Sequence, residues 1–182
     1  MALDLSRLSC LVVEDALFMR SLLATCLNAL GINQFKMVDH GGTAIDFLKL
    51  QKADPMKAGM QTVDLIISNW QMSPVDGMML LRWVRRHAES PNRFVPFIML
   101  SGYSGLASVA EARNMGVTEF VTKPFSIKTF AQRLQLVIER PRQFVHAGDY
   151  FGPDRRRRSE TYAGTERRVL TDKSPGVEVI HG

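Results

Sequence analysis

Five short apolar runs, separated by amphipathic segments of helical length, constrain the fold of this chain more than any other feature. The runs lie within residues 10–13, 35–38, 65–67, 97–100 and 120–121, and none alternates regularly between apolar and polar residues. Such runs are typical of strands that are buried on both faces of a parallel sheet. Each is followed by a segment whose apolar residues recur at three- and four-residue steps, as on one face of a helix.

This alternation predicts an α/β fold of five strand–helix units, with a doubly wound parallel five-stranded sheet. Right-handed crossovers between parallel strands make the doubly wound form the expected one. In sheets of this kind, ligands bind beyond the carboxyl ends of the strands. The residues that directly follow each strand are therefore the first place to look for chemistry.

The chain changes character near Pro141. The whole sequence of 182 residues has 23 Lys+Arg and 18 Asp+Glu, a formal charge of +5, and six arginines lie within 155–168. After residue 140 there is no long apolar period, and Gly and Pro are frequent. We therefore predict a globular domain over residues 7–140, followed by an extended, flexible, partly disordered Arg-rich tail over residues 141–182.

Several classes of protein are excluded by composition and pattern. No apolar run reaches the roughly 18–20 residues that a membrane span needs, and the first ten residues lack the features of a signal peptide, so a cytoplasmic protein is expected. Cys10 and Cys26 are too few for a disulfide framework, and neither has a partner at metal-binding spacing. The tail is too short and polar for a helix-turn-helix, so duplex DNA is not an expected partner.

Polar side chains follow four of the five runs. Glu14 and Asp15 come after the first run, Asn69 after the third, Ser101 after the fourth and Lys123 after the fifth. Adjacent carboxylates are oxygen ligands that suit Mg²⁺, and a lysine with a small hydroxyl group could hold a phosphoryl group. Each residue alone is also compatible with an ordinary loop or turn. Their joint placement at one edge of the sheet favours a functional site.

These residues and their neighbours resemble the receiver domain of response regulators, of the single-domain CheY-like kind. The resemblance covers about residues 7–140 and implies the flavodoxin/CheY-like fold and a signalling module, not an enzyme. An enzyme of the haloacid-dehalogenase-like or nucleotide-binding type is a weaker alternative, because Glu14-Asp15 matches its nucleophilic Asp poorly. The matching stretches are LVVEDALFMR at 11–20, ISNWQMSP at 67–74 with Asp76-Gly77, MLSG at 99–102 and VTKPF at 121–125.

The resemblance assigns roles to the residues at the strand ends. It implies that Glu14, Asp15 and the backbone carbonyl of Gln71 hold Mg²⁺. It also implies that Ser101 and Lys123 contact a phosphoryl group. These roles are expectations from the family and not consequences of spacing.

The resemblance also implies a switch and a partner-binding face. Phe120 occupies the place of the aromatic residue that changes rotamer on activation, and Lys123-Pro124 is expected to be a cis peptide. The fourth helix, fifth strand and fifth helix would form the partner face. The expected partners are a histidine kinase, a flagellar motor switch component or another chemosensory protein, since Trp70-Gln71-Met72 resembles the chemotaxis branch of the family.

One position departs from the family pattern, and it is the central one. The Asp that accepts the phosphoryl group in the family matches Asn69 here. A neutral amide oxygen is a much poorer nucleophile than a carboxylate, and the lost negative charge weakens Mg²⁺ binding. Two interpretations remain open: a natural pseudoreceiver that cannot form an aspartyl phosphate, or an ordinary phosphoacceptor whose Asp has been replaced. Ser73, where the family usually has proline, is a milder departure.

The arginine cluster of the tail also has two interpretations. It is either a solvated basic segment that only raises the pI, or a site for an anion, because guanidinium groups bind phosphate and guanine edges in a bidentate manner. Nonspecific nucleic acid or an acidic protein surface would fit the same cluster. The tail is similar to the Arg-rich extensions of CheY-like effectors that bind cyclic di-GMP. That resemblance would make the nucleotide-binding residues Arg155, Arg156, Arg157, Arg158, Arg167 and Arg168.

Overall fold

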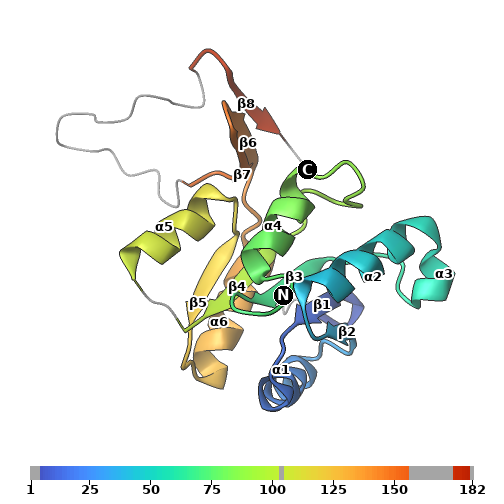
Figure 1. Cartoon of the computed structure of the whole chain (residues 1–182). Helices are drawn as coiled ribbons and strands as arrows, with labels where there is room; N and C mark the ends of the chain where they lie inside the picture. Colours follow the sequence, from blue (N-terminus) through green and yellow to red (C-terminus); the bar gives the residue numbers. More distant parts are fainter. Residues whose placement is uncertain (1–4, 103–104, 156–173, 181–182) are drawn as a thin grey trace.

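The structure is a computed structural model that describes residues 5–102, 105–155 and 174–180. Its main element is a parallel five-stranded sheet of order β2-β1-β3-β4-β5, drawn in Figure 1. The predicted doubly wound α/β fold is therefore confirmed. The strands are β1 (Ser9–Val13), β2 (Gln34–Val38), β3 (Leu65–Asn69), β4 (Phe97–Ser101) and β5 (Glu119–Thr122).

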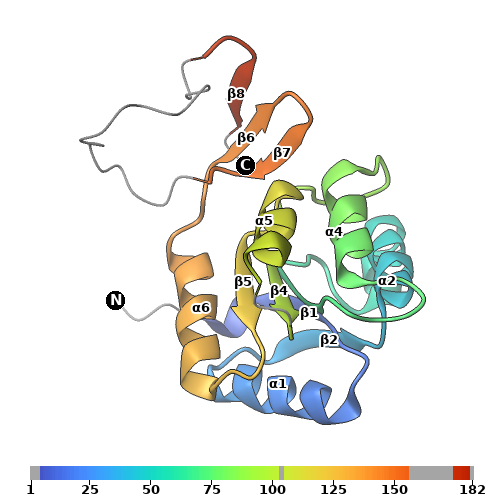
Figure 2. The ribbon, with the colours of Figure 1, turned by 60° about the vertical axis from the view of Figure 1, so that its left-hand side comes forward.

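Helices cover both faces of this sheet. One face carries α1 and α6, and the other carries α2, α4 and α5, as Figure 2 shows. A short 3-10 helix (Leu5–Arg7) precedes the first strand, and a short helix follows α2. The helices are α1 (Leu17–Ala29), α2 (Gly41–Ala53), α3 (Pro55–Ala58), α4 (Gly77–Arg86), α5 (Leu106–Asn114) and α6 (Ile127–Glu139).

The absence of polar alternation in the central strands follows from two separate cores, whereas the edge strand β2 has no buried residue and does not fit the expectation of burial on both faces. In β1, Leu11 and Val13 belong to the core beneath α2, α4 and α5. Their neighbours Cys10 and Val12 belong to the core beneath α1 and α6. Because successive residues of a strand point to opposite faces, a strand between two cores needs apolar residues at every position. All five residues of β1 are buried.

The region after residue 140 contains a small sheet that the sequence analysis did not predict. It is antiparallel, with the order β7-β6-β8, and it lies beyond the ends of α4 and α5 (Figure 1). Its apolar side packs Phe144 and Phe151 against Phe94, with ring centroids 5.3–5.5 Å apart. The strands are β6 (Phe144–Ala147), β7 (Tyr150–Pro153) and β8 (Val177–Ile180).

A buried arginine joins the two sheets. Arg85 of α4 is fully buried, and its guanidinium group donates hydrogen bonds to the backbone carbonyls of Gly116, Arg93 and Val95 at 3.0, 2.8 and 2.8 Å. The same group lies 5.1 Å from the ring centroid of Phe144 in β6. The hydrogen bonds fix the guanidinium group within the receiver, and its contact with the Phe144 ring then links the receiver to the small sheet.

Two glycines bring the backbones of the two parts into direct contact. A Cβ atom built on Gly116 would lie 2.6 Å from the carbonyl oxygen of Phe151, and one built on Gly152 would lie 2.6 Å from Cα of Gly116. Gly116 also has a φ of +91°, a conformation that favours glycine. Neither position can take a side chain without separating the two segments.

None of the helices in the described part of the chain combines the length and the apolar character that a membrane span requires.

Candidate functional site

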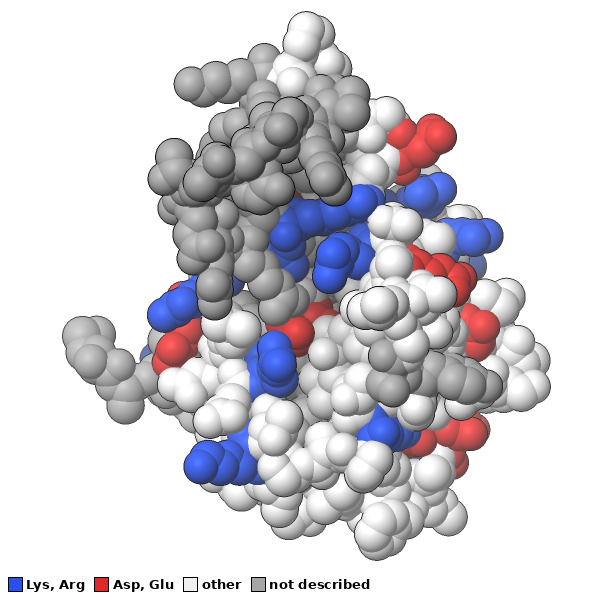
Figure 3. Space-filling model, turned by 90° about the vertical axis from the view of Figure 1, so that its left-hand side faces the viewer, with Lys and Arg blue, Asp and Glu red and all other residues white. Residues whose placement is uncertain are grey.

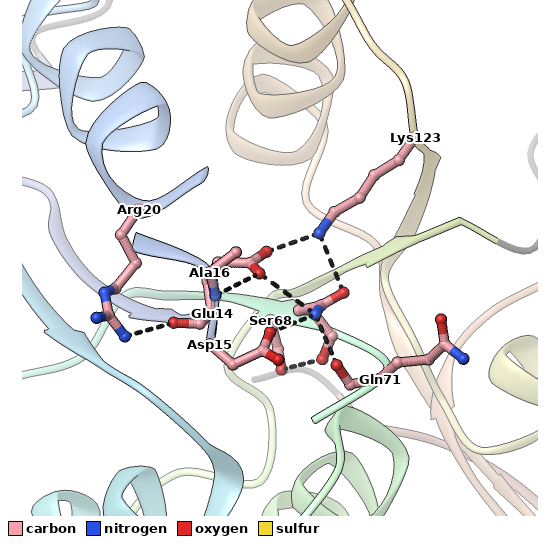
Figure 4. A network of polar contacts seen from close by, with 8 residues as sticks. Glu14, Asp15, Ala16, Arg20, Ser68, Gln71 and Lys123 are labelled. Atoms are coloured by element: carbon pink, nitrogen blue, oxygen red, sulfur yellow. Dashed lines mark hydrogen bonds and ion pairs between the residues drawn. The ribbon is translucent and has the colours of Figure 1, made fainter. Parts of the chain in front are cut away.

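Most of the residues predicted at the strand ends, though not Ser101, meet in one polar pocket, which Figure 4 shows from close by. Glu14 and Asp15 directly follow β1, Asn69 ends β3, Gln71 lies two residues further on, and Lys123 follows β5. The parallel strand order brings these ends to the same edge of the sheet. We call this set the strand-end pocket.

The side-chain amide of Asn69 is the centre of the strand-end pocket. Its Nδ2 atom lies within hydrogen-bond distance of three acceptors: Glu14 Oε1 at 3.3 Å, Asp15 Oδ1 at 2.9 Å and the Gln71 carbonyl oxygen at 2.8 Å. Its Oδ1 atom accepts a hydrogen bond from Lys123 Nζ at 3.1 Å. The amide therefore presents its donor side to the acidic groups and its acceptor side to the lysine.

The two carboxylates of the pocket differ in burial, in their partners and in the direction of their pKa shifts. Glu14 is only 1% exposed and forms an ion pair with Lys123 at 2.7 Å between Oε2 and Nζ. Burial nevertheless outweighs the lysine and raises the pKa of Glu14 above its usual 4.5. Asp15 is exposed; its slight burial is the largest single influence and opposes ionisation, but the hydrogen bonds that its carboxylate makes, led by the one from Asn69, together with the charge of Lys123 outweigh it and lower the pKa of Asp15.

Further groups support the pocket, and the sequence analysis assigned none of them a role. Arg20 donates a hydrogen bond to the backbone carbonyl of Glu14 at 2.8 Å, and Ser68 Oγ donates to the backbone carbonyl of Asn69 at 2.9 Å. A Cβ atom built on Gly77 would lie 2.2 Å from that same Asn69 carbonyl oxygen. Arg20 lies within the stretch that resembles the family, but nothing in its residue type or spacing pointed to the loop after β1.

The fit of Mg²⁺ to the pocket depends on the orientation of this amide. Two carboxylates and a backbone carbonyl are ligands of the right kind for Mg²⁺. In the structure, however, these same three groups surround the Asn69 nitrogen, whose hydrogens would repel a cation. The residues as placed do not fit Mg²⁺.

The remaining residues with predicted roles lie beside the pocket. Ser101 is fully buried at the end of β4, and its backbone carbonyl accepts a hydrogen bond from the Lys123 N–H at 2.7 Å. Phe120 of β5 is half-buried, and its ring meets Trp70 edge to face, with centroids 6.0 Å apart and planes at 85°. The expected cis peptide at Lys123-Pro124 is present. A second cis peptide, Ser73-Pro74, was not predicted.

Only one of the six tail arginines with a predicted role lies in the described part of the chain. Arg155 is exposed after β7, and its guanidinium carbon lies 4.1 Å from the ring centroid of Tyr150. The other five lie outside the described residues: Arg156, Arg157, Arg158, Arg167 and Arg168.

Comparison with known proteins identifies the family. Residues 10–135 match the response regulator receiver domain, and the chain belongs to this family. Its relatives include the chemotaxis protein CheY-3 of Vibrio cholerae, 29% identical over 130 residues that cover 71% of this chain and 91% of the relative. The CheY homologue of Campylobacter jejuni is 30% identical over 128 residues, covering 70% and 90% of the two chains.

Solved structures of receiver domains agree with the fold. The V. cholerae chemotaxis protein CheY4 matches with a TM-score of 0.58 and 26% identity, over 71% of this chain and 98% of that one. The receiver domain of the sensor histidine kinase PA1611 from Pseudomonas aeruginosa matches with a TM-score of 0.59 and 22% identity, over 72% and 98%. That structure has a magnesium ion in its active-site cleft. Together with the family match, this makes the chain a CheY-like receiver domain of signal transduction, followed by a segment beyond the matched region.

Proposed function

We propose that this protein is a chemotaxis-type signalling module that acts through protein–protein contacts and does not form an aspartyl phosphate with Asn69 in place. The observation that carries the proposal is the hydrogen-bond network of the Asn69 amide. Its nitrogen is bound to the groups that would hold a metal, and its oxygen is bound to Lys123. Both ends of the side chain are therefore committed to contacts within the pocket.

The chemistry of the amide supports the same conclusion. Transfer of a phosphoryl group to this position requires an oxygen with the electron density of a carboxylate. The Asn69 oxygen is neutral and accepts a hydrogen bond from the lysine ammonium group at 3.1 Å, which withdraws further density. The lysine also neutralises Glu14 at 2.7 Å, so the acidic groups of the pocket are stabilised without a phosphoryl group.

The partners follow from the family and its relatives. The relatives are chemotaxis proteins by name, and their class suggests a histidine kinase, a flagellar motor switch component or another chemosensory protein. The partner face predicted from the sequence corresponds to α5, β5 and α6. The side chain of Phe120 lies on this face and touches Trp70, which directly follows Asn69. This contact gives a route by which the strand-end pocket and the partner face can influence one another.

The test is incubation with a small phosphodonor and Mg²⁺, measuring phosphate incorporation. We expect none in the chain with Asn69, and incorporation in Asn69→Asp, where a carboxylate returns to an otherwise complete pocket. Asn28→Asp, which adds the same charge at an exposed position of α1, should incorporate none. Incorporation by the chain with Asn69 would overturn the proposal. Under the alternative that Asn69 replaces an original Asp, Asn69→Asp is the functional form.

Binding of cyclic di-GMP through the arginine tail is a second candidate function. The observation that favours it is the exposed Arg155, whose guanidinium group is held over Tyr150 at 4.1 Å. Calorimetry with cyclic di-GMP tests it, by comparing the chain with a variant in which Arg155–Arg158 are replaced by Ala. Saturable binding that this replacement abolishes supports the candidate. An absence of heat, or equal binding by both proteins, rules it out.

A further inference from the structure

A cavity lined by four arginines lies outside the strand-end pocket. It has a volume of about 500 Å³ and lies between α5, β5, α6 and the segment that leads into and out of the small sheet. Its arginines are Arg113 of α5, Arg133 of α6, and Arg142 and Arg155 of that segment. We call this cavity the arginine hollow. Figure 3 shows Lys and Arg side chains gathered around the centre of this face.

The positive charge of the arginine hollow exceeds its negative charge. Among the described residues that line it, Glu119 is the only acidic one, and its Oε1 atom lies 3.4 Å from Arg133. Arg113 and Arg155 form no ion pair within the described part of the chain. Four guanidinium groups thus share one cavity with one carboxylate, and this arrangement attracts an anion.

The guanidinium groups contributed after residue 140 are held by the protein. Arg142 is half-buried and donates hydrogen bonds to the backbone carbonyls of Thr118, at 3.2 Å, and Asp154. Arg155 lies over the ring of Tyr150, which is itself tied to the Pro153 carbonyl by a 2.7 Å hydrogen bond. Side chains that are already ordered lose less entropy when a ligand binds.

We infer that the arginine hollow is a binding site for a small ligand that carries two or more negative charges on phosphate groups. Guanidinium groups bind phosphate oxygens in a bidentate manner, and a phosphate group concentrates more charge than the single carboxylate of an acidic side chain. The volume is within the range of small-molecule sites, roughly 300–1,000 Å³. The site combines the receiver and the small sheet, so neither part forms it alone. This inference is independent of whether Asn69 can be phosphorylated.

Calorimetry with inorganic pyrophosphate, on the full chain and without divalent metal, tests the inference. We expect saturable binding that weakens at least tenfold in the double variant Arg113→Gln/Arg133→Gln. Both side chains are exposed, so the fold should persist, which circular dichroism would verify. The matched control is the double variant Arg82→Gln/Arg140→Gln, which removes the same charge at exposed positions that do not line the hollow. Its affinity should change less than twofold.

Three results would overturn the inference. The first is an absence of pyrophosphate binding by the parent chain. The second is an equal loss of affinity in the hollow and control variants, which would mean that only net charge matters. The third is binding of duplex DNA that competes with pyrophosphate and weakens equally in both variants, as expected of a nonspecific basic surface. None of these assays involves a phosphodonor or Asn69, and Arg113 and Arg133 lie outside the segment that is replaced in the cyclic di-GMP test. Failure here is therefore distinguishable from failure of either function proposed above.

Discussion

The strand-end pocket and the arginine hollow are both polar, but the pocket pairs its polar groups with one another whereas the hollow holds a large excess of positive charge. In the pocket, the Asn69 amide and Lys123 provide hydrogen-bond donors to Glu14, Asp15 and the Gln71 carbonyl. In the hollow, four arginines face a single carboxylate among the described lining residues. A site whose polar groups are hydrogen-bonded to one another has little need of a ligand, whereas a site with a large excess of one charge attracts one. The receiver fold therefore has, at its usual place, a site whose polar groups are already paired, and beside it a site with an excess of positive charge.

The largest expected effect is on the pocket, from loss of its cation. Lys123→Met leaves the buried Glu14 carboxylate without its partner, and we expect the free energy of unfolding at pH 7 to fall by about 3 kcal/mol. Urea denaturation measures it, with Lys128→Met, at an exposed position of α6, as the matched control. An equal, small loss in both variants would show that the pocket does not depend on internal charge balance.

The same variant has a defined pH dependence. Burial already raises the pKa of Glu14 above 4.5, and Lys123 is the group that opposes this rise. In the variant, the folded state should therefore hold the Glu14 proton to higher pH than the unfolded state does. The deficit should be small below pH 4.5, where both states are protonated, and should grow as the pH rises through the raised pKa. A deficit that shrinks with rising pH would contradict this sign.

An intermediate effect is expected from Asn69→Asp, which adds a third carboxylate to the pocket and removes the hydrogen-bond donor at its centre. Three carboxylates would share one lysine, and their repulsion should lower the free energy of unfolding by about 1–2 kcal/mol in the absence of divalent metal. Added Mg²⁺ should restore stability to the variant by binding only its folded state, and should leave the chain with Asn69 unchanged. Thermal melts with and without Mg²⁺ measure both. Equal stabilisation of the two proteins would mean that the pocket with Asn69 also binds Mg²⁺, and that its polar groups are not fully committed to one another.

The smallest effect is expected in the hollow. Glu119→Gln removes its acidic lining residue, and we expect pyrophosphate affinity to rise by about threefold, the size of a partly screened charge interaction. Glu111→Gln, at an exposed position of α5, removes the same charge outside the hollow and should change affinity less. Calorimetry measures both. Weaker binding in Glu119→Gln would show that Glu119 serves to position Arg133, and that its charge does not limit the affinity.

The two sites also differ in how far the sequence predicts them. Glu14, Asn69 and Lys123 each follow an apolar run, and the parallel sheet brings such positions together by rule. The direction in which the Asn69 amide faces is set by side-chain torsion and by its neighbours, which no spacing records. The roles implied by the family resemblance for Ser101 and Phe120 stay predictions, since the structure gives their places and not their actions.

Sequence patterns could not predict the hollow or the small sheet, because both depend on contacts between segments that are distant in the chain. Arg113 and Arg133 lie within helices that predict only a solvated face, and they become neighbours of Arg142 and Arg155 through tertiary packing. The strands β6, β7 and β8 have four residues each, too few to establish a period, and β6 pairs with β8 about thirty residues later in the chain. Their stability comes from Phe94 and Arg85, which belong to the receiver. Local sequence carries no record of such distant support.

The contact between Gly116 and Gly152 suggests a way to classify related chains by whether their C-terminal extension packs against the receiver. Gly116 has a positive φ, so its own turn favours glycine whether or not a second segment packs against it. Gly152 has no such backbone requirement, and what excludes its side chain is the approach of Gly116 and of the Tyr150 hydroxyl. In an alignment of receivers with C-terminal extensions, glycine at this second position would therefore distinguish extensions that dock from those that only trail behind the domain.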